Sequence, residues 1–256
     1  TVDFQNKTIL VTGASRGIGA AIAKAFAAES AAVAVNYLNN KEAADATVAA
    51  CEAAGGAALA FQADVTDRKA ADDLVEAVLG EFGKIDVLVN NAFHPYSFDP
   101  ETRKMHWELE WSDYQRQIDG AVKSAHGLIQ SVLPTMLTRA EGSIINIATD
   151  LVARPSIPYH DYTTAKAALI GFSRNLAVEL GRLGVRVNTV APGLVYPTDA
   201  SRATKEAVKD SIIAQTPMRR IATPGDVTGP VLFLASEWSS FMTGQTLYVD
   251  GGLVMG

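Results

Sequence analysis

Short hydrophobic runs alternate with longer alanine-rich or amphipathic segments along the chain. The short runs are predicted to be strands, and they cover residues 7–11, 32–36, 57–64, 87–91, 143–148, 186–191 and 246–249. Helices are predicted between them, over residues 20–28, 41–54, 66–82, 112–139, 161–183 and 224–235, the fourth beginning with a cap at Ser112. Strands that alternate with helices of this length form βαβ units. The pattern therefore predicts an α/β fold, a doubly wound, seven-stranded parallel sheet with helices on both faces.

A glycine-rich stretch, residues 12–19, joins the first predicted strand to the first predicted helix. Gly13, Gly17 and Gly19 leave the backbone free for close approach, and the helix start directs N–H groups and a positive dipole end at one point. This arrangement suits a diphosphate. The alternative is a tight turn whose glycines serve packing only.

Other candidate site residues end successive predicted strands. They are Asp64, Asn90, Thr149 and the pair Pro192-Gly193. Aspartate and asparagine at such positions often cap helices or form turns. Because ligands of open parallel sheets bind outside the carboxyl ends of the strands, we expect a shared site here.

Tyr162 and Lys166 are four residues apart on a predicted helix, so both side chains lie on one face. A lysine ammonium favours the phenolate and is expected to lower the pKa of Tyr162, which makes this tyrosine a candidate general acid or base. Thr149 ends a strand 13 residues earlier, and its hydroxyl could polarise a carbonyl. In the alternative, Thr149 only caps the strand end and Ser156 supplies the hydroxyl.

Composition narrows the class of protein. The 256 residues show no linker and no change of composition, so we expect a single domain over residues 1–256. A net charge of −6 argues against nucleic-acid binding, and charged residues interrupt the apolar helices, which argues against a membrane span. The single cysteine, Cys51, the absence of a signal peptide before the first strand and the spacing of the four histidines predict a cytoplasmic protein without a metal site.

The motifs together resemble those of the short-chain dehydrogenase/reductase family. They are Thr12-Gly13-x3-Gly17-x-Gly19, Asn90-Asn91-Ala92, Tyr162-x3-Lys166, Pro192-Gly193 and the ending from Thr243 to Gly252. The resemblance covers essentially the whole chain. It implies a Rossmann-fold, NAD(P)-dependent oxidoreductase that is usually tetrameric. In it, Tyr162 exchanges a proton with the substrate oxygen, Lys166 holds the nicotinamide ribose and tunes Tyr162, and Thr149 stands in place of a serine.

The resemblance also implies which residues hold the cofactor. They are Gly13, Ser15, Arg16, Gly17, Ile18, Gly19, Asn36, Tyr37, Asp64, Val65, Asn90, Ala92, Tyr162, Lys166, Pro192, Gly193 and Val195. We expect NADP(H) to be favoured over NAD(H), since the second strand ends without the aspartate that binds a ribose 2′-hydroxyl. Arg16 could pair with a 2′-phosphate. The alternative is a solvated Arg16 and an Asn36 that tolerates either cofactor.

Three positions depart from the family pattern. Phe93 replaces a glycine after Ala92, and the active-site asparagine falls at Ala121 or near Asp119. The threonine that usually follows Pro-Gly comes one position late, as Thr198. The aromatic segment 93–111 is predicted to be a pocket wall, or else loop packing or a subunit interface. Residues 196–217, with a helix near 203–214, occupy the place of the family's mobile lid.

The expected activity is reduction of a small-molecule ketone to a secondary alcohol by a homotetramer. Within the family, the pattern is most similar to the 3-oxoacyl-carrier-protein reductases. The alternatives are a sugar, polyol or steroid alcohol dehydrogenase, and a cofactor-binding protein of this fold whose catalysis has decayed.

Overall fold

The computed structural model describes residues 2–255 and contains one seven-stranded sheet with the order β3-β2-β1-β4-β5-β6-β7. All six strand pairs are parallel. The strands are β1 (Thr8–Val11), β2 (Ala32–Tyr37), β3 (Ala57–Gln62), β4 (Val87–Asn90), β5 (Gly142–Ile147), β6 (Val185–Pro192) and β7 (Thr246–Val249). The predicted fold is confirmed.

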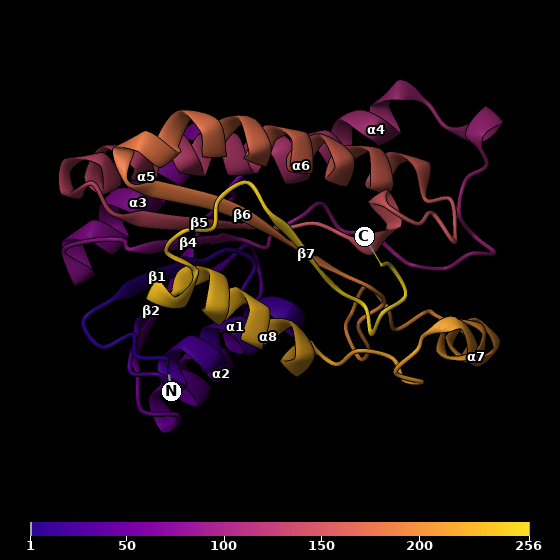
Figure 1. Cartoon of the computed structure of the whole chain (residues 1–256), viewed down its shortest axis with the longest axis horizontal. Helices are drawn as coiled ribbons and strands as arrows, with labels where there is room; N and C mark the ends of the chain where they lie inside the picture. Colours follow the sequence, from indigo (N-terminus) through magenta and orange to yellow (C-terminus); the bar gives the residue numbers. More distant parts are fainter. Residues whose placement is uncertain (1, 256) are drawn as a thin grey trace.

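Helices cover both faces of the sheet (Figure 1). One layer holds α1 (Gly17–Ala28), α2 (Lys41–Ala53) and α8 (Pro224–Ala235); the other holds α3 (Arg68–Phe82), α4 (Trp111–Ile118), α5 (Ser124–Arg139) and α6 (His160–Leu180). The short helix α7 (Glu206–Gln215) lies beyond the carboxyl end of the sheet. The two layers leave that edge of the sheet for a site.

The strands are hydrophobic throughout because both of their faces are covered. In β1, Ile9 and Val11 belong to the core on the α1 side, whereas Leu10 belongs to the core on the α3 side. All three side chains are fully buried. Successive side chains of a strand point to opposite faces, so one short strand contributes to both cores.

The sheet order reverses at β1, which pairs with β2 on one side and with β4 on the other. Chains leaving β1 and β4 toward helices on opposite faces open a crevice at the carboxyl ends of these strands. The residues that follow them, Thr12 and Asn91, are linked by a hydrogen bond from the Asn91 backbone N–H to Thr12 Oγ1 at 3.0 Å. The glycine-rich turn therefore borders this crevice.

The prediction of one helix over 112–139 capped by Ser112 was wrong. Helix α4 begins at Trp111 after Glu110, whose backbone N–H donates to the Asp113 carboxylate at 3.0 Å. A π-helical turn, Asp119–Lys123, then separates α4 from α5. The sequence shows no break because the helical backbone continues with a wider turn.

The remaining boundaries differ by a few residues from those predicted. Helix α6 ends at Leu180 and is followed by a 3₁₀ turn, Gly181–Leu183. Helix α7 begins three residues later than expected. Within residues 2–255, no helix combines the length and hydrophobicity needed to cross a membrane.

Candidate active site

The glycine-rich turn adopts backbone conformations that only glycine accepts easily. Gly13 and Gly17 have φ values of +60° and +58°. A Cβ on Gly19 would lie 2.5 Å from the Gly13 carbonyl oxygen. Arg16 is the N-cap of α1, so the first N–H groups of that helix face the crevice. Since these glycines carry no side chains of their own, the backbone is open to close approach, and this cradle fits the diphosphate of a dinucleotide.

Two asparagine side chains hold the turn in place. Asn36 Oδ1 accepts from the Gly13 N–H at 3.2 Å, and its Nδ2 donates to the Ala63 carbonyl at 3.2 Å. Asn91 Nδ2 donates to the Thr12 and Gly13 carbonyls at 2.9 and 3.2 Å. The supporting role of Asn91 was missed in the sequence, although it stands between Asn90 and Ala92 in a recognised motif.

Asn36, expected to face the cofactor ribose, is 2% exposed. Its amide donates to and accepts from other protein groups, so it is not an exposed neutral side chain that could contact the ribose. The neighbouring Tyr37 is also buried, and Asp64 accepts from the N–H and hydroxyl of Thr66 at 2.9 and 2.7 Å. The Asp64 side chain thus forms the turn that was the alternative interpretation.

Asn90 takes part in a buried polar chain across the sheet. Its Nδ2 donates to Asn146 Oδ1 at 2.8 Å, and Asn146 Nδ2 donates to the Ser173 hydroxyl at 2.7 Å. Asn90 Oδ1 is buried without a partner among the described residues. A buried acceptor left over is costly, which makes this amide a candidate contact for a bound group.

The other expected cofactor residues lie around the crevice in varied roles. Backbone hydrogen bonds fix three of them: the Ala92 N–H donates to Thr12 Oγ1, the Ser15 carbonyl accepts from Thr47, and the Gly193 N–H donates to the Val249 carbonyl. Ile18 and Val65 pack against the cores on the two faces of the sheet. Pro192 ends β6, and Val195 forms a β-bridge with Ala222.

Tyr162, Lys166 and Thr149 come together at the carboxyl end of β5. Lys166 Nζ donates to the Ile147 carbonyl at 2.7 Å and lies 5.9 Å from the centroid of the Tyr162 ring. The three side chains are 7%, 3% and 5% exposed, respectively. Thr149 lies close enough to Tyr162 to affect its pKa, so two hydroxyl side chains and a lysine share this buried end of the strand.

Burial is the main cause of the pKa shifts of Tyr162 and Lys166. It raises the pKa of Tyr162, and the negative charge of Asp150 adds to the rise, whereas the nearby Thr149 hydroxyl opposes it. The expected lowering of the Tyr162 pKa by Lys166 is therefore not what this structure shows. Burial also lowers the pKa of Lys166 to about 8, so the ammonium that would favour a phenolate is itself destabilised.

Known proteins match this chain over nearly its full length. The family model described as enoyl-(acyl carrier protein) reductase matches residues 13–254. The 3-oxoacyl-[acyl-carrier-protein] reductase of Staphylococcus epidermidis is 39% identical over 250 residues, 98% of this chain and 100% of that protein. The chain belongs to the short-chain dehydrogenase/reductase family. It is an oxidoreductase of the ketoreductase type.

Solved structures of the family superpose closely. The 3-oxoacyl-[acyl-carrier protein] reductase of Brucella melitensis has a TM-score of 0.90 at 33% identity and covers 99% of this chain and 93% of its own. A 7α-hydroxysteroid dehydrogenase complexed with NADH and 7-oxo glycochenodeoxycholic acid has a TM-score of 0.89 at 32% identity, covering 98% and 95%. The matched structures thus include a dinucleotide complex.

Aromatic rings cover the Tyr162 side chain. Phe98 and Tyr96 lie 5.0 and 5.2 Å from the Tyr162 ring, centroid to centroid, and Phe93 lies 6.1 Å away. The Tyr96 hydroxyl donates to Asp161 Oδ1 at 2.9 Å, which fixes it to the start of α6. Residues 93–98 therefore pack against Tyr162, and whether they also form a pocket wall stays a prediction.

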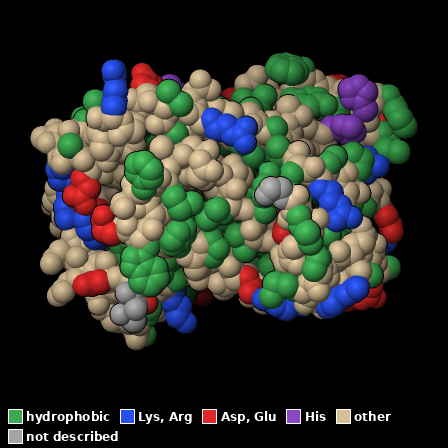
Figure 2. Space-filling view, in the orientation of Figure 1, with side chains coloured by type: hydrophobic (Ala, Val, Ile, Leu, Met, Phe, Trp, Pro, Cys, Tyr) green, Lys and Arg blue, Asp and Glu red, His purple; other side chains and the backbone are tan. Residues whose placement is uncertain are grey.

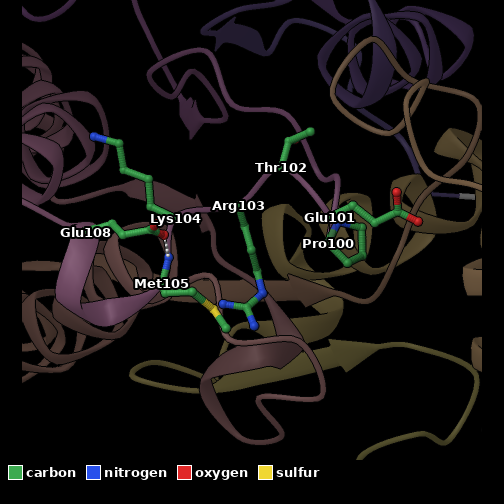
Figure 3. Close-up of a pocket in the computed structure, with 7 residues that line it drawn as sticks. All are labelled: Pro100, Glu101, Thr102, Arg103, Lys104, Met105 and Glu108. Atoms are coloured by element: carbon green, nitrogen blue, oxygen red, sulfur yellow. Dashed lines mark hydrogen bonds between the residues drawn. The ribbon is translucent and has the colours of Figure 1, made fainter.

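The rest of the aromatic segment has a different environment. Residues 100–108 surround a hollow of about 550 Å³, lined by Pro100, Glu101, Thr102, Arg103, Lys104, Met105 and Glu108 (Figure 3). The dashed line in that view marks the bond from the Met105 N–H to the Glu108 carboxylate at 2.7 Å. The lining omits Thr149, Tyr162 and Lys166, and Trp107 and Trp111 are exposed. This hollow is separate from the group of Thr149, Tyr162 and Lys166.

The lid segment is tied to both the aromatic wall and the glycine-rich turn. The Phe98 N–H donates to the Ala200 carbonyl at 3.0 Å, and Thr204 Oγ1 donates to the Phe98 carbonyl at 3.0 Å. Arg16 Nη1 pairs with Asp199 Oδ2 at 2.6 Å. This segment thus contacts the glycine-rich turn that borders the crevice, and its Asp199 carboxylate holds Arg16.

The place expected for the family asparagine lies in the π-helical turn. Ala121 is buried there, and Asp119 Oδ1 accepts from Gln115 Nε2 at 2.9 Å. A Cβ on Gly120 would lie 2.4 Å from the His94 backbone nitrogen, so this turn packs directly under the aromatic wall. The Asp119 side chain is therefore bonded to the preceding helix, α4.

The remaining predictions concern metals and thiols. Among residues 2–255, no group of three or more histidine, cysteine, aspartate or glutamate side chains could hold a metal ion. The rings of His106 and His160 lie side by side, with centroids 5.6 Å apart and planes tilted by 52°. Burial raises the pKa of Cys51 to about 11, as expected for an inert thiol.

Proposed function

We propose that this protein is an NADP(H)-dependent reductase that converts a ketone to a secondary alcohol. The observation that carries the proposal is the group of Thr149, Tyr162 and Lys166 at the end of β5, beside a glycine cradle on the same edge of the sheet. The full-length similarity to 3-oxoacyl-[acyl-carrier-protein] reductases supports a 3-oxoacyl compound as the substrate.

The chain's own residues would bind the cofactor, orient the ketone and protonate its oxygen. The turn at Gly13, Gly17 and Gly19 would hold the diphosphate, and Lys166 the nicotinamide ribose. When bound, the reduced cofactor supplies a hydride for the carbonyl carbon. Thr149 would donate a hydrogen bond to the carbonyl oxygen as negative charge develops on it. Tyr162 would transfer its proton to that oxygen, which gives the alcohol.

The direct test is turnover with a panel of ketones. Purified protein is mixed with NADPH and, separately, with 3-oxoacyl thioesters, diketones, keto sugars and a 7-oxo steroid, and absorbance of the cofactor is followed. Oxidation of NADPH with a 3-oxoacyl thioester is expected. Activity confined to a sugar or steroid selects one of the alternative dehydrogenases, and no turnover with any ketone, despite cofactor binding, selects a decayed enzyme.

Cofactor choice depends on Arg16, which sits at the start of α1. A guanidinium pairs strongly with a phosphate, but Asp199 already occupies it at 2.6 Å. We expect Arg16→Ala to lower kcat/KM for NADPH about tenfold more than for NADH. Asp199→Asn, which releases Arg16, should instead increase the preference for NADPH. Steady-state kinetics with both cofactors check this, and a wild type faster with NADH contradicts it.

We further propose a homotetramer in the cytoplasm. Hydrophobic side chains gather over α8 and β7 on the face seen in Figure 2. Close by in sequence, Trp238 and Phe241 are exposed between these elements, and large exposed apolar patches mark interfaces. Light scattering at micromolar concentration should give four times the chain mass, and Phe241→Asp should reduce it. A monomeric wild type contradicts the proposal.

A further inference from the structure

Asp150 is a buried carboxylic side chain directly after Thr149, and the mechanism above leaves it unused. It is 4% exposed at the start of a 3₁₀ turn, Asp150–Val152. Thr149 Oγ1 donates to its Oδ1 at 3.4 Å. A Cβ on Gly193 would lie 3.2 Å from its Oδ2, so the carboxyl group fills space that Gly193 leaves open.

Charged and titratable groups face Asp150 from three directions. Asp250 approaches from the end of β7, Tyr162 from α6, and Arg154 from the chain after the 3₁₀ turn. Asp250 accepts from the N–H groups of residues 252, 253 and 254. Arg154 is engaged by the Leu253 carbonyl at 3.0 Å and by Gln215 at 2.8 Å. The Arg154 guanidinium is therefore already bonded to other groups, while the Asp250 carboxylate lies close to Asp150.

This environment favours the neutral acid. Burial raises the pKa of Asp150, the charge of Asp250 raises it further, and the Thr149 hydrogen bond lowers it, with a result of about 7. Near neutral pH, Asp150 thus exists both as an acid that can donate a proton and as a carboxylate that can only accept one.

The Thr149 hydroxyl has one proton and more than one acceptor within reach. Asp150 Oδ1 accepts from it at 3.4 Å, the Tyr162 hydroxyl lies close by, and its oxygen accepts from the Leu151 N–H at 3.4 Å. An ionised Asp150 takes the Thr149 proton for itself. A protonated Asp150 donates to the second lone pair of the Thr149 oxygen, which frees the Thr149 proton.

We propose that Asp150 is a positioning residue: as the neutral acid it donates a hydrogen bond to Thr149, so that Thr149 can donate its own proton to the substrate oxygen. The inference rests on the proposed reductase function. It gives this enzyme a second acid beside Tyr162, one that makes no contact with the reacting atoms and acts only through Thr149.

The proposal predicts a pH dependence with a definite sign. The donating form of Asp150 is present below about pH 7 and is lost as the pH rises through that value. The kcat for ketone reduction should therefore fall as Asp150 ionises, before Lys166 loses its charge near pH 8. Asp150→Asn donates through its amide and does not titrate, so this variant should lose the first fall and keep activity within about threefold of wild type at pH 6.

Removing the donor gives the complementary result. Asp150→Leu should lower kcat about 5- to 30-fold at pH 6 with little change in KM, as for loss of one hydrogen bond to a developing charge. In a Thr149→Val background, neither Asp150 variant should have a further effect, because Asp150 has nothing left to position. Asp86→Asn is the matched control, a buried aspartate that accepts from the Thr8 N–H just before β4 and should leave the pH profile unchanged.

The measurements are kcat and KM from pH 5.5 to 9 for each variant, with Tm and NADPH fluorescence as checks of folding and cofactor binding. If Asp150→Asn does not fold, Asp150→Ser supplies a donor in its place. The inference is supported if Asp150→Asn loses the fall in kcat near pH 7 and if the Asp150 variants have no further effect in the Thr149→Val background. An unchanged pH profile, or effects that simply add to Thr149→Val, overturns it. A wild type that reduces no ketone overturns the proposed function and this inference together. A wild type that reduces ketones with an unchanged pH profile in the variants overturns this inference alone, so the two failures are distinguishable.

Discussion

Tyr162→Phe should lower kcat for ketone reduction by about 10²- to 10⁴-fold or more, because it removes the proton that the proposed mechanism transfers. The substitution deletes one oxygen and keeps the ring that packs against Phe98 and Tyr96 at 5.0 and 5.2 Å. The fold and cofactor affinity should therefore be retained. Steady-state kinetics, together with fluorescence titration of NADPH, measure the two properties separately.

Lys166→Ala provides the contrasting variant. Lys166 is assigned to both the ribose and the tuning of Tyr162, so this change should reduce the rate and the cofactor affinity together. If Tyr162→Phe retained activity near that of wild type, the assignment of the general acid would be wrong. If Lys166→Ala changed the rate alone, Lys166 would not hold the cofactor.

The fold could be predicted because its determinants are local and repeated. A buried strand such as Thr8–Val11 is hydrophobic at every position, and the glycines that follow it need conformations that other residues avoid. The Tyr162–Lys166 pair follows from helical spacing alone. These features survive in a single sequence without knowledge of what packs against them.

The electrostatics of the site could not be predicted in the same way. The sequence places a lysine beside Tyr162, but burial, which raises the pKa of Tyr162, comes from Tyr96, Phe98 and other residues distant in sequence. Asp150 was missed for the same reason, because Gly193 and Asp250 reach it only when β6 and β7 pair with the rest of the sheet.

Side-chain partners explain the remaining differences. Asn36 ends a strand as predicted, but its amide bonds to Gly13 and Ala63 on neighbouring segments. Arg16 is exposed as a phosphate ligand would be, yet its partner Asp199 comes from the lid, 183 residues later in the chain. A motif in the sequence gives the position of a polar residue on its strand or helix. The group to which its side chain bonds depends on the tertiary fold.

Thr149→Val should cost about 10²- to 10³-fold in kcat, as for loss of one hydrogen-bond donor to a developing oxyanion. Valine keeps the branched shape and removes only the hydroxyl. Thr149→Ser retains the donor and should keep most of the activity. The catalytic interpretation is supported by the place of Thr149, which is 5% exposed and close enough to Tyr162 to affect its pKa.

The same hydroxyl also caps the 3₁₀ turn that follows, accepting from the Leu151 N–H at 3.4 Å. Loss of a cap destabilises a protein by about 1 kcal/mol, so Tm must be measured beside the kinetics. Ser156, the alternative source of the hydroxyl, is exposed, and Ser156→Ala should have almost no effect. A silent Thr149→Val with a damaged Ser156→Ala would transfer the role to Ser156. A fall in Tm with unchanged kcat would leave Thr149 with the cap alone.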